Sequence, residues 1–288
     1  MASSKRVRTN IIQAGGKTLM LNHYAKVAPP HKTLLDLFGG GGAILLWDDA
    51  SEGKTYNDIN DRAANYWRVV RDRGKFQELY RLLQATEYGR RVFEESIEVI
   101  DDRGASDIQR AWAWCVHTTQ GFTHQEDEVG WRMAKPSSMA STWQKGVQRL
   151  PQIHEEMQRV NIECMDWRQC LKVYGNGGPG QLIVADPPYL APDQDTLTYR
   201  HPFTIEDHYE LLWQLDHQDA MVIICGYDSV LYQENLRSPK WEIVKRVRPM
   251  MVKNSDYESD GQEREECMWL SLGDWRNHSG GLWSTMLD

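Results

Sequence analysis

The chain has 288 residues, of which 41% are hydrophobic and 26% are charged, and its formal net charge is −8. This length suits one large domain, or a core domain with a smaller insertion, and the composition is ordinary for a globular protein. No apolar run approaches the ~20 residues of a membrane-spanning helix, and the N-terminus has no apolar signal core. The acidic balance argues against a protein that coats nucleic acid non-specifically, and the five cysteines, without a C-x-x-C pair, indicate neither a zinc site nor a disulfide framework.

The first predicted elements have the order of a nucleotide-binding sheet. Residues 32–38 form a short apolar run that predicts a buried strand, and the glycines at 39–42 and a helix from Ala43 follow it. Residues 54–60 predict a second strand, and the next helix carries apolar residues at helical spacing. This succession of strand, glycine loop, helix and strand predicts the opening of a doubly wound, Rossmann-like α/β sheet.

From residue 76 to about residue 160 the pattern becomes helical. Residues 76–100 and 111–116 predict helices, whereas residues 120–142 are irregular and rich in Gly, Ser, Met, Trp and charged residues. Strand alternation is not apparent in this part of the sequence. We therefore expect a mostly helical insertion that carries a long functional loop.

The sheet is expected to resume at residues 160–166 and to continue with the apolar run 181–185. Asp186-Pro187-Pro188-Tyr189 ends that run, because two consecutive prolines stop a strand and fix the backbone of a turn. A helix is expected at residues 205–216, with Thr204 as its N-cap, and an apolar strand at residues 221–225. Residues 241–247 and 267–272 are expected to form the two strands of an antiparallel hairpin.

The turn at residues 186–189 combines a carboxylate, rigid carbonyl groups and an aromatic ring at the carboxyl end of a strand, where open α/β sheets bind ligands. Asp186 and a proline carbonyl can accept hydrogen bonds from an exocyclic amino group, and Tyr189 can stack on a planar ring. Taken alone, these four residues are equally compatible with a plain turn that exposes its carboxylate to solvent.

The glycine loop does not match the loops that bind phosphates, because the third glycine of the dinucleotide fingerprint is missing. A pattern of Asp36, Phe38 and glycines remains. Asp58 ends the next strand, where doubly wound folds bind ribose hydroxyls. A nucleoside without phosphates fits, and S-adenosylmethionine is the obvious candidate. Asp166 could then hold the adenine amino group, with Trp167 against the ring. Each acid alone is more often a capping or turn residue, but their succession at strand ends favours binding.

With these residues in place, the chain resembles the Dam-like (D12 class) N6-adenine DNA methyltransferases. The likeness covers residues 11–75 and 160–272. Its N-terminal motifs are the A-G-G-K element (14–17), the D-x-F-x-G-G-G loop (36–42) and the N-D-x-N element (57–60). The acid at residue 166 comes before the expected catalytic turn, D-P-P-Y (186–189). The Y…F segment (199–203) and C-G-Y-D-S…L-Y (225–232) follow that turn. Residues 117–122 match the central signature of the class poorly, so no recognition sequence is implied.

The resemblance implies an α/β fold: a doubly wound S-adenosylmethionine-dependent methyltransferase sheet with a mostly helical inserted target-recognition domain. The expected catalytic domain comprises residues 1–75 and 160–275, the insertion residues 76–159 and a C-terminal tail residues 276–288. The implied catalytic residues are Asp186, Pro187, Pro188 and Tyr189. The implied cofactor-binding residues are Gly16, Lys17, Asp36, Phe38, Gly39, Gly41, Asp58, Asp166, Trp167 and Asp186. Expected DNA contacts, for which a solvated surface is the alternative, are Arg132, Lys135, Lys145, Arg149, Tyr199 and Arg248.

The predicted reaction is direct methyl transfer from S-adenosylmethionine to N6 of an adenine flipped out of double-stranded DNA, without a metal or a covalent enzyme intermediate. Alternatives are transfer to amino groups of cytosine, of adenine or guanine in RNA, or of protein glutamine, and a catalytically silent DNA-binding decoy. The resemblance also implies a monomer or weak dimer in the cytoplasm of a bacterium or a phage-infected host, with restriction-linked, regulatory and viral roles all open and a phage or prophage gene as one source.

Overall fold

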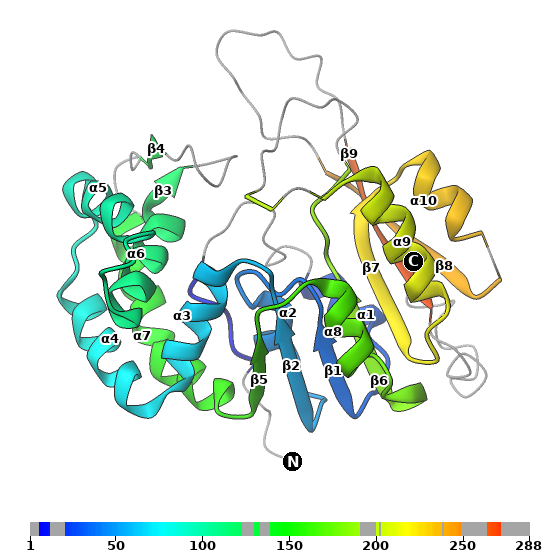
Figure 1. Cartoon of the computed structure of the whole chain (residues 1–288), viewed down its shortest axis with the longest axis horizontal. Coiled ribbons are helices and arrows are strands. Elements are labelled where there is room, and N and C mark those ends of the chain that lie inside the picture. Colours follow the sequence, from blue (N-terminus) through cyan, green and yellow to red (C-terminus); the bar gives the residue numbers. More distant parts are fainter. Residues whose placement is uncertain are drawn as a thin grey trace, which may run out of the picture.

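A central seven-stranded sheet organises the protein (Figure 1). The computed structural model describes residues 6–11, 21–122, 130–132, 139–190, 200–201, 203–237, 239–248 and 264–271. The strands of this sheet are β1 (Thr33–Asp36), β2 (Gly53–Asn57), β5 (Val160–Glu163), β6 (Gln181–Ala185), β7 (Met221–Tyr227), β8 (Trp241–Arg248) and β9 (Arg264–Ser271).

The strand order is β5-β2-β1-β6-β7-β9-β8. The five strands from β5 to β7 are parallel to their neighbours, whereas β9 is antiparallel to both β7 and β8. After β1 the chain extends the sheet through β2 and β5, and it then returns to place β6 on the other side of β1. This reversal is the topological switch point of a doubly wound fold, and ligands bind beside it at the carboxyl ends of the strands. The predicted fold class is therefore confirmed.

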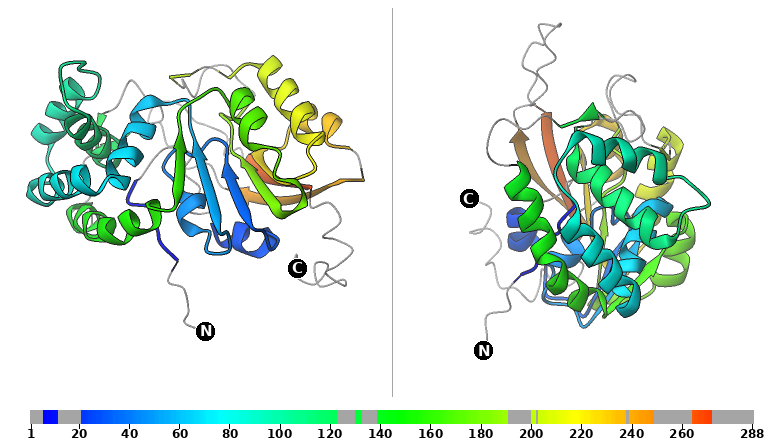
Figure 2. Two further views of the ribbon diagram at one scale, coloured as in Figure 1. Left: turned by 60° about the horizontal axis from the view of Figure 1, so that its bottom comes forward. Right: turned by 90° about the vertical axis from the view of Figure 1, so that its left-hand side faces the viewer.

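Helices cover both faces of the sheet (Figure 2). Their bounds are α1 (Leu21–Val27), α2 (Ala43–Trp47), α3 (Asp61–Arg71), α4 (Arg73–Ala85), α5 (Arg90–Val99), α6 (Asp107–Gln120), α7 (Met139–Met157), α8 (Trp167–Tyr174), α9 (Ile205–Asp216) and α10 (Val230–Asn235). The N-cap of α9 is Thr204, as predicted, and it forms a capping box with Asp207. Within the described ranges, none of these helices is long and apolar enough to cross a membrane.

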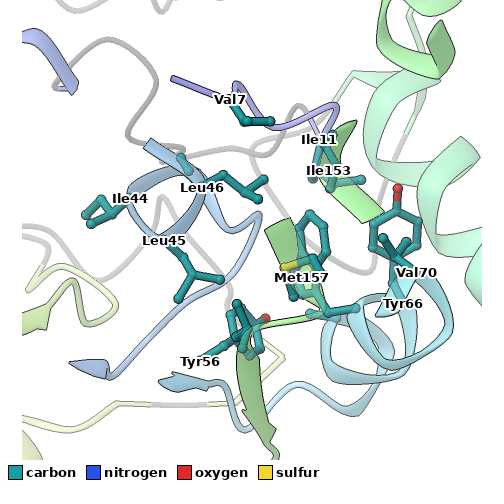
Figure 3. Packing of buried hydrophobic residues seen from close by; sticks show 14 of the residues in the cluster. Val7, Ile11, Ile44, Leu45, Leu46, Tyr56, Tyr66, Val70, Ile153 and Met157 are labelled. Atoms are coloured by element: carbon teal, nitrogen blue, oxygen red, sulfur yellow. The ribbon is translucent and has the colours of Figure 1, made fainter. Parts of the chain in front are cut away.

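Two buried clusters lie on opposite faces of the sheet. Leu34 and Val184 belong to the cluster under α1–α4, α6 and α7, whereas their neighbours Leu35 and Ile183 belong to the cluster under α8, α9 and α10. Successive residues of a strand point to opposite faces, so a sheet covered on both sides needs the continuous apolar runs that the sequence shows. In the first cluster, Val7 and Ile11 of the N-terminal segment pack with Leu46 of α2 and Ile153 of α7 (Figure 3).

The region between α3 and β5 is mostly helical, as predicted, and its helices stand beside the β5 edge of the sheet (Figure 1). Three details differ from the prediction. The segment 76–100 forms two helices separated at residues 86–89, and α7 already begins at Met139. Residues Gly121–Phe122 (β3) and Gly130–Trp131 (β4) pair as short antiparallel strands. Two residues are too few to show strand alternation, so the sequence could not reveal this pair.

Candidate active site

Carboxylates from neighbouring strands meet at the switch point. Asp36 is the last residue of β1, Asp58 follows β2 and Asp186 follows β6. Asp36 is only 2% exposed, and burial, with further contributions from the negative charges of Asp186 and Asp58, raises its pKa to about 8. The backbone N–H of Leu45 acts in the opposite direction. Because these carboxylates repel one another in a poorly solvated place, the site favours a cationic ligand.

Asp58 holds the glycine loop in addition to facing this site. Its Oδ2 accepts a hydrogen bond from the Gly40 N–H at 2.7 Å, and its Oδ1 accepts one from the Asn60 N–H at 2.8 Å. Each carboxylate oxygen has a second lone pair, so these bonds leave acceptor capacity for a hydroxyl group of a ligand.

The glycines of the loop are required by the protein around them. A Cβ atom on Gly39 would lie 2.3 Å from the ring of Tyr56, and one on Gly42 would lie 2.9 Å from the ring of Trp67, at a residue whose φ is +66°. Both aromatic side chains also donate hydrogen bonds to the Gly40 carbonyl, from the Tyr56 hydroxyl at 2.9 Å and the Trp67 Nε1 at 3.0 Å. At both positions a protein side chain therefore occupies the space that a Cβ atom would need.

The Gly41 carbonyl accepts a hydrogen bond from the Thr9 hydroxyl at 2.6 Å, which connects the N-terminal segment to the loop. Asn57, buried at the end of β2, joins the ends of two other strands. Its Nδ2 donates to the carbonyls of Leu37 and Met165, both at 3.1 Å, and its Oδ1 accepts from the Met165 N–H at 3.2 Å. Asn57 belongs to the predicted N-D-x-N element, and its position as a polar residue at the end of a buried strand was a usable signal for this role.

Asp166 and Trp167 lie at the start of α8. Asp166 caps the helix by accepting from the Arg168 N–H at 2.8 Å, and it forms an ion pair of 3.3 Å with the Arg168 guanidinium. Its side chain is 42% exposed. Trp167 is only 5% exposed, and the Arg168 guanidinium lies 4.4 Å from the centroid of its ring. Little of the Trp167 ring is therefore open to a ligand.

Phe38, which follows β1, is partly buried and meets Phe203 edge-on, with ring centroids 5.6 Å apart. Phe203 in turn lies 6.3 Å from the Trp167 ring and 4.7 Å from the ring of His208. An aromatic cluster therefore borders the site beside Asp166. Tyr199, the other residue of the predicted Y…F segment, lies outside the described residues.

The Asp-Pro-Pro-Tyr turn directly follows β6. The hydroxyl of Tyr189 donates a hydrogen bond of 3.0 Å to Oε1 of Glu266 on β9. The Tyr189 ring meets the ring of Tyr227 edge-on, with centroids 4.7 Å apart and planes at 72°. Burial, followed by the charge of Asp186, raises the pKa of the Tyr189 hydroxyl well above its ordinary value. The contact with Glu266 could not be predicted from the sequence, because Glu266 lies 77 positions from Tyr189 in the chain.

His208 is a second functional-site neighbour that the sequence analysis missed. It lies on α9 with no exposed surface, and its Nδ1 is 3.0 Å from the hydroxyl of Tyr232. Burial lowers the pKa of His208 to about 4, although the backbone of Pro188 acts in the opposite direction. At neutral pH the imidazole is therefore uncharged, and it lies beside the Pro188 backbone of the Asp-Pro-Pro-Tyr turn.

The predicted DNA-contacting residues do not all fall within the described part of the chain. Gly16 and Lys17 of the predicted cofactor set and Lys135 of the DNA set lie outside it, and the structure describes only the backbone of Arg248, at the end of β8. Of the others, Lys145 is exposed on α7.

Arg132 and Arg149 are each partly buried. The Arg132 N–H donates to the Gln120 carbonyl at 2.9 Å, and its carbonyl accepts from the Tyr88 hydroxyl at 2.7 Å, so the backbone after β4 is fixed to α6 and to the loop before α5. Burial, with the charge of Arg8, lowers the pKa of Arg149. A guanidinium that is poorly solvated beside another one favours an anionic partner.

A search among curated proteins found no match. Among solved structures, an SAM-dependent methyltransferase from Agrobacterium tumefaciens is similar at 11% identity with a TM-score of 0.38, over 88% of this chain and 60% of that one. The proposed methyltransferase yhhF from Escherichia coli is similar at 12% identity with a TM-score of 0.35, over 94% of this chain and 89% of that one. This chain thus spans less than two thirds of the first structure, and at these TM-scores neither likeness adds to the fold established by the strand order.

A family model gives the stronger result. The model described as D12 class N6 adenine-specific DNA methyltransferase matches residues 14–248. The matched range includes the glycine loop, the acids at the strand ends and the Asp-Pro-Pro-Tyr turn. The match confirms the predicted family. The chain belongs to the D12 class N6 adenine-specific DNA methyltransferase family.

Proposed function

We propose that this protein transfers a methyl group from S-adenosylmethionine to N6 of an adenine that is flipped out of double-stranded DNA. The observation that carries the proposal is the position of the Asp-Pro-Pro-Tyr turn, at the switch point of the sheet and beside the buried Asp36. A turn that can accept hydrogen bonds from an amino group is therefore next to a site that favours a cationic ligand. The family match supports the same reaction.

The residues at the switch point fit the cofactor. S-adenosylmethionine supplies an activated methyl group on a positively charged sulfonium. The carboxylates of Asp58 and Asp186 provide complementary negative charge, and Asp36 adds to it when the bound cation favours its ionised form. Asp58 retains lone pairs for ribose hydroxyls, and the half-exposed Asp166 can accept from the adenine amino group. Phe38, with the loop residues Gly39 and Gly41, completes the proposed cofactor site, and Trp167 contributes only the small part of its ring that is open. Gly16 and Lys17 are proposed from the motif alone.

The catalytic turn is proposed to activate the amino group. The lone pair of adenine N6 is delocalised into the ring, which makes the amine a poor nucleophile. Hydrogen bonds from the NH2 group to the Asp186 carboxylate and the Pro187 carbonyl favour a pyramidal nitrogen whose lone pair faces the methyl group. Pro188 keeps the turn rigid, and Tyr189 stacks on the flipped base, a contact that contributes ~1–3 kcal/mol and offsets much of the cost of flipping.

The target strand is proposed to meet the helical region. Residues 76–159 would provide target recognition, whereas residues 1–75 and 160–275 would provide catalysis. Arg132, Arg149 and Lys145 are proposed DNA contacts, because their positive charges can bind phosphate groups. The two arginines are partly buried, and Lys145 is exposed. Lys135, Tyr199 and Arg248 are proposed from the sequence. The proposed working form is a monomer or weak dimer in the cytoplasm of a bacterium or a phage-infected cell.

The decisive experiment identifies the labelled product. The purified protein is incubated with radiolabelled S-adenosylmethionine and mixed-sequence duplex DNA, and the DNA is digested to nucleosides. Label in N6-methyladenine is the expected result. Label in N4-methylcytosine would overturn the base assignment, and no label despite intact cofactor binding would favour an RNA or protein substrate or a silent decoy. Asp186→Ala protein serves as the control, and it should bind the cofactor without transferring label.

A further inference from the structure

Glu266 is a buried carboxylate at a position where the sequence pattern calls for an apolar residue. It is 6% exposed, and it shares its face of β9 with Met268 and Leu270, both of which belong to the first core cluster. Burying a carboxylate among apolar side chains costs several kcal/mol unless hydrogen bonds compensate. A residue that breaks the local pattern in this way points to a functional requirement.

The sheet topology brings Glu266 to the active site. Because β9 runs antiparallel to β7, its first residues lie at the edge of the sheet where the parallel strands end. Glu266 is paired there with Tyr227, the last residue of β7. The ring of Tyr227 meets the ring of Tyr189 edge-on at 4.7 Å, and the Glu266 carboxylate accepts the Tyr189 hydroxyl at 3.0 Å. Tyr227 and Glu266, which are paired on adjacent strands, thus both contact the side chain of Tyr189.

The hydroxyl of Tyr189 is not needed for stacking, because a phenyl ring would present the same π-face to a base. A partly buried hydroxyl needs a hydrogen-bond partner, and here the partner is a charged one. The hydrogen bond fixes the far end of the ring, and the edge-on contact with Tyr227 restricts its tilt. Both constraints act on the plane in which a flipped base would have to lie.

We propose that Glu266 is a positioning residue that fixes the ring plane of Tyr189 for stacking on the flipped target base. This role rests on the proposed function, since it presupposes that Tyr189 stacks on the base. Glu266 acts only through Tyr189. Its removal should therefore affect steps that involve the target base and leave cofactor binding unchanged.

The test is a double-mutant cycle with Glu266→Ala, Tyr189→Phe and the double variant, together with Glu266→Gln. The readouts are kcat/KM for duplex DNA, the affinity for S-adenosylmethionine, and the fluorescence of 2-aminopurine placed at the target position that the methylation assay identifies. A hydrogen bond to a charged group corresponds to roughly a 10- to 100-fold change in kcat/KM. We expect that loss in Glu266→Ala and in Tyr189→Phe, with a reduced 2-aminopurine signal and no further loss in the double variant. Glu266→Gln, which keeps an acceptor oxygen, should restore most of kcat/KM.

Controls separate positioning from general damage. Glu242→Ala, on the neighbouring strand β8, should leave kcat/KM and the fluorescence signal unchanged. Wild-type kcat/KM and fluorescence in Glu266→Ala would overturn the proposal, and so would additive losses in the double variant. If Glu266→Ala fails to fold, kcat/KM of Glu266→Gln is compared with kcat/KM of Tyr189→Phe. A Glu266→Gln variant that is as impaired as Tyr189→Phe would overturn the proposal. A wild-type protein that transfers no methyl group to DNA refutes the proposed function itself, whereas an active wild type with an unaffected Glu266→Ala refutes only the role of Glu266.

Discussion

Replacing Asp36 with asparagine should stabilise the cofactor-free protein by an amount that grows with pH. The folded carboxyl group keeps its proton until about pH 8, whereas the unfolded one loses it near its ordinary pKa of 3.8. Between these values the folded state binds more protons than the unfolded state, so the free energy of unfolding falls as the pH rises. The slope for one group is about 1.4 kcal/mol per pH unit, and the loss from pH 5 to pH 7 is therefore about 3 kcal/mol. An asparagine does not titrate and avoids this loss.

Urea denaturation of both proteins at pH 5, 6, 7 and 8, followed by circular dichroism, measures the difference directly. The buried His31–Asp48 ion pair, at 3.1 Å, titrates in both proteins and cancels in this difference. The excess stability of Asp36→Asn over wild type should rise by about 3 kcal/mol from pH 5 to pH 7. An excess that stays constant with pH would refute the argument that Asp36 is protonated in the folded protein.

The raised pKa of Asp36 should also couple cofactor binding to the release of a proton. A cationic ligand favours the ionised form of Asp36, so S-adenosylmethionine should bind wild-type protein with release of a proton below pH 8. Calorimetry in buffers of different ionisation enthalpy measures that release. The uncharged sulfur of S-adenosylhomocysteine should release fewer protons, and equal release for both ligands would contradict the proposed contact between Asp36 and the sulfonium.

Three further substitutions test individual contacts. Asp186→Ala should abolish methyl transfer in the labelling assay while calorimetry shows cofactor affinity within about threefold of wild type, and near-normal turnover would refute its role with the amino group. Asp58→Ala removes the acceptor for the backbone N–H groups of Gly40, in the glycine loop, and of Asn60, before α3, and it should weaken cofactor binding about tenfold or more, so unchanged affinity would argue against a binding role. Gly39→Ala places a Cβ 2.3 Å from an aromatic ring and should cost about 1–3 kcal/mol in urea denaturation. Its control is Gly53→Ala, whose Cβ meets nothing closer than 3.5 Å, and an equal loss in both variants would contradict the steric explanation.

The sequence by itself determined the parts of the protein that depend on neighbours along the chain. The strand at residues 181–185 and the helix at residues 205–216 have the predicted bounds, because a proline pair ends the first and a capping box begins the second. The succession of acids at strand ends could also be predicted. All parallel strands end at one edge of a sheet, so the sequence placed Asp36, Asp58 and Asp186 at that edge, and the pairing of β1 with both β2 and β6 then brings them close together.

Only the tertiary structure decided the contacts between distant parts of the chain. Glu266 of β9 accepts a hydrogen bond from Tyr189, and His208 of α9 interacts with the Pro188 backbone, and no local pattern relates these residues to one another. The position of β9 between β7 and β8 determines which of its residues reach the carboxyl ends of the parallel strands. The need for glycine at position 39 likewise follows from a ring that packs against it from the next strand. These features depend on strand order and side-chain packing, which are set by long-range contacts and not by the residues adjacent in sequence.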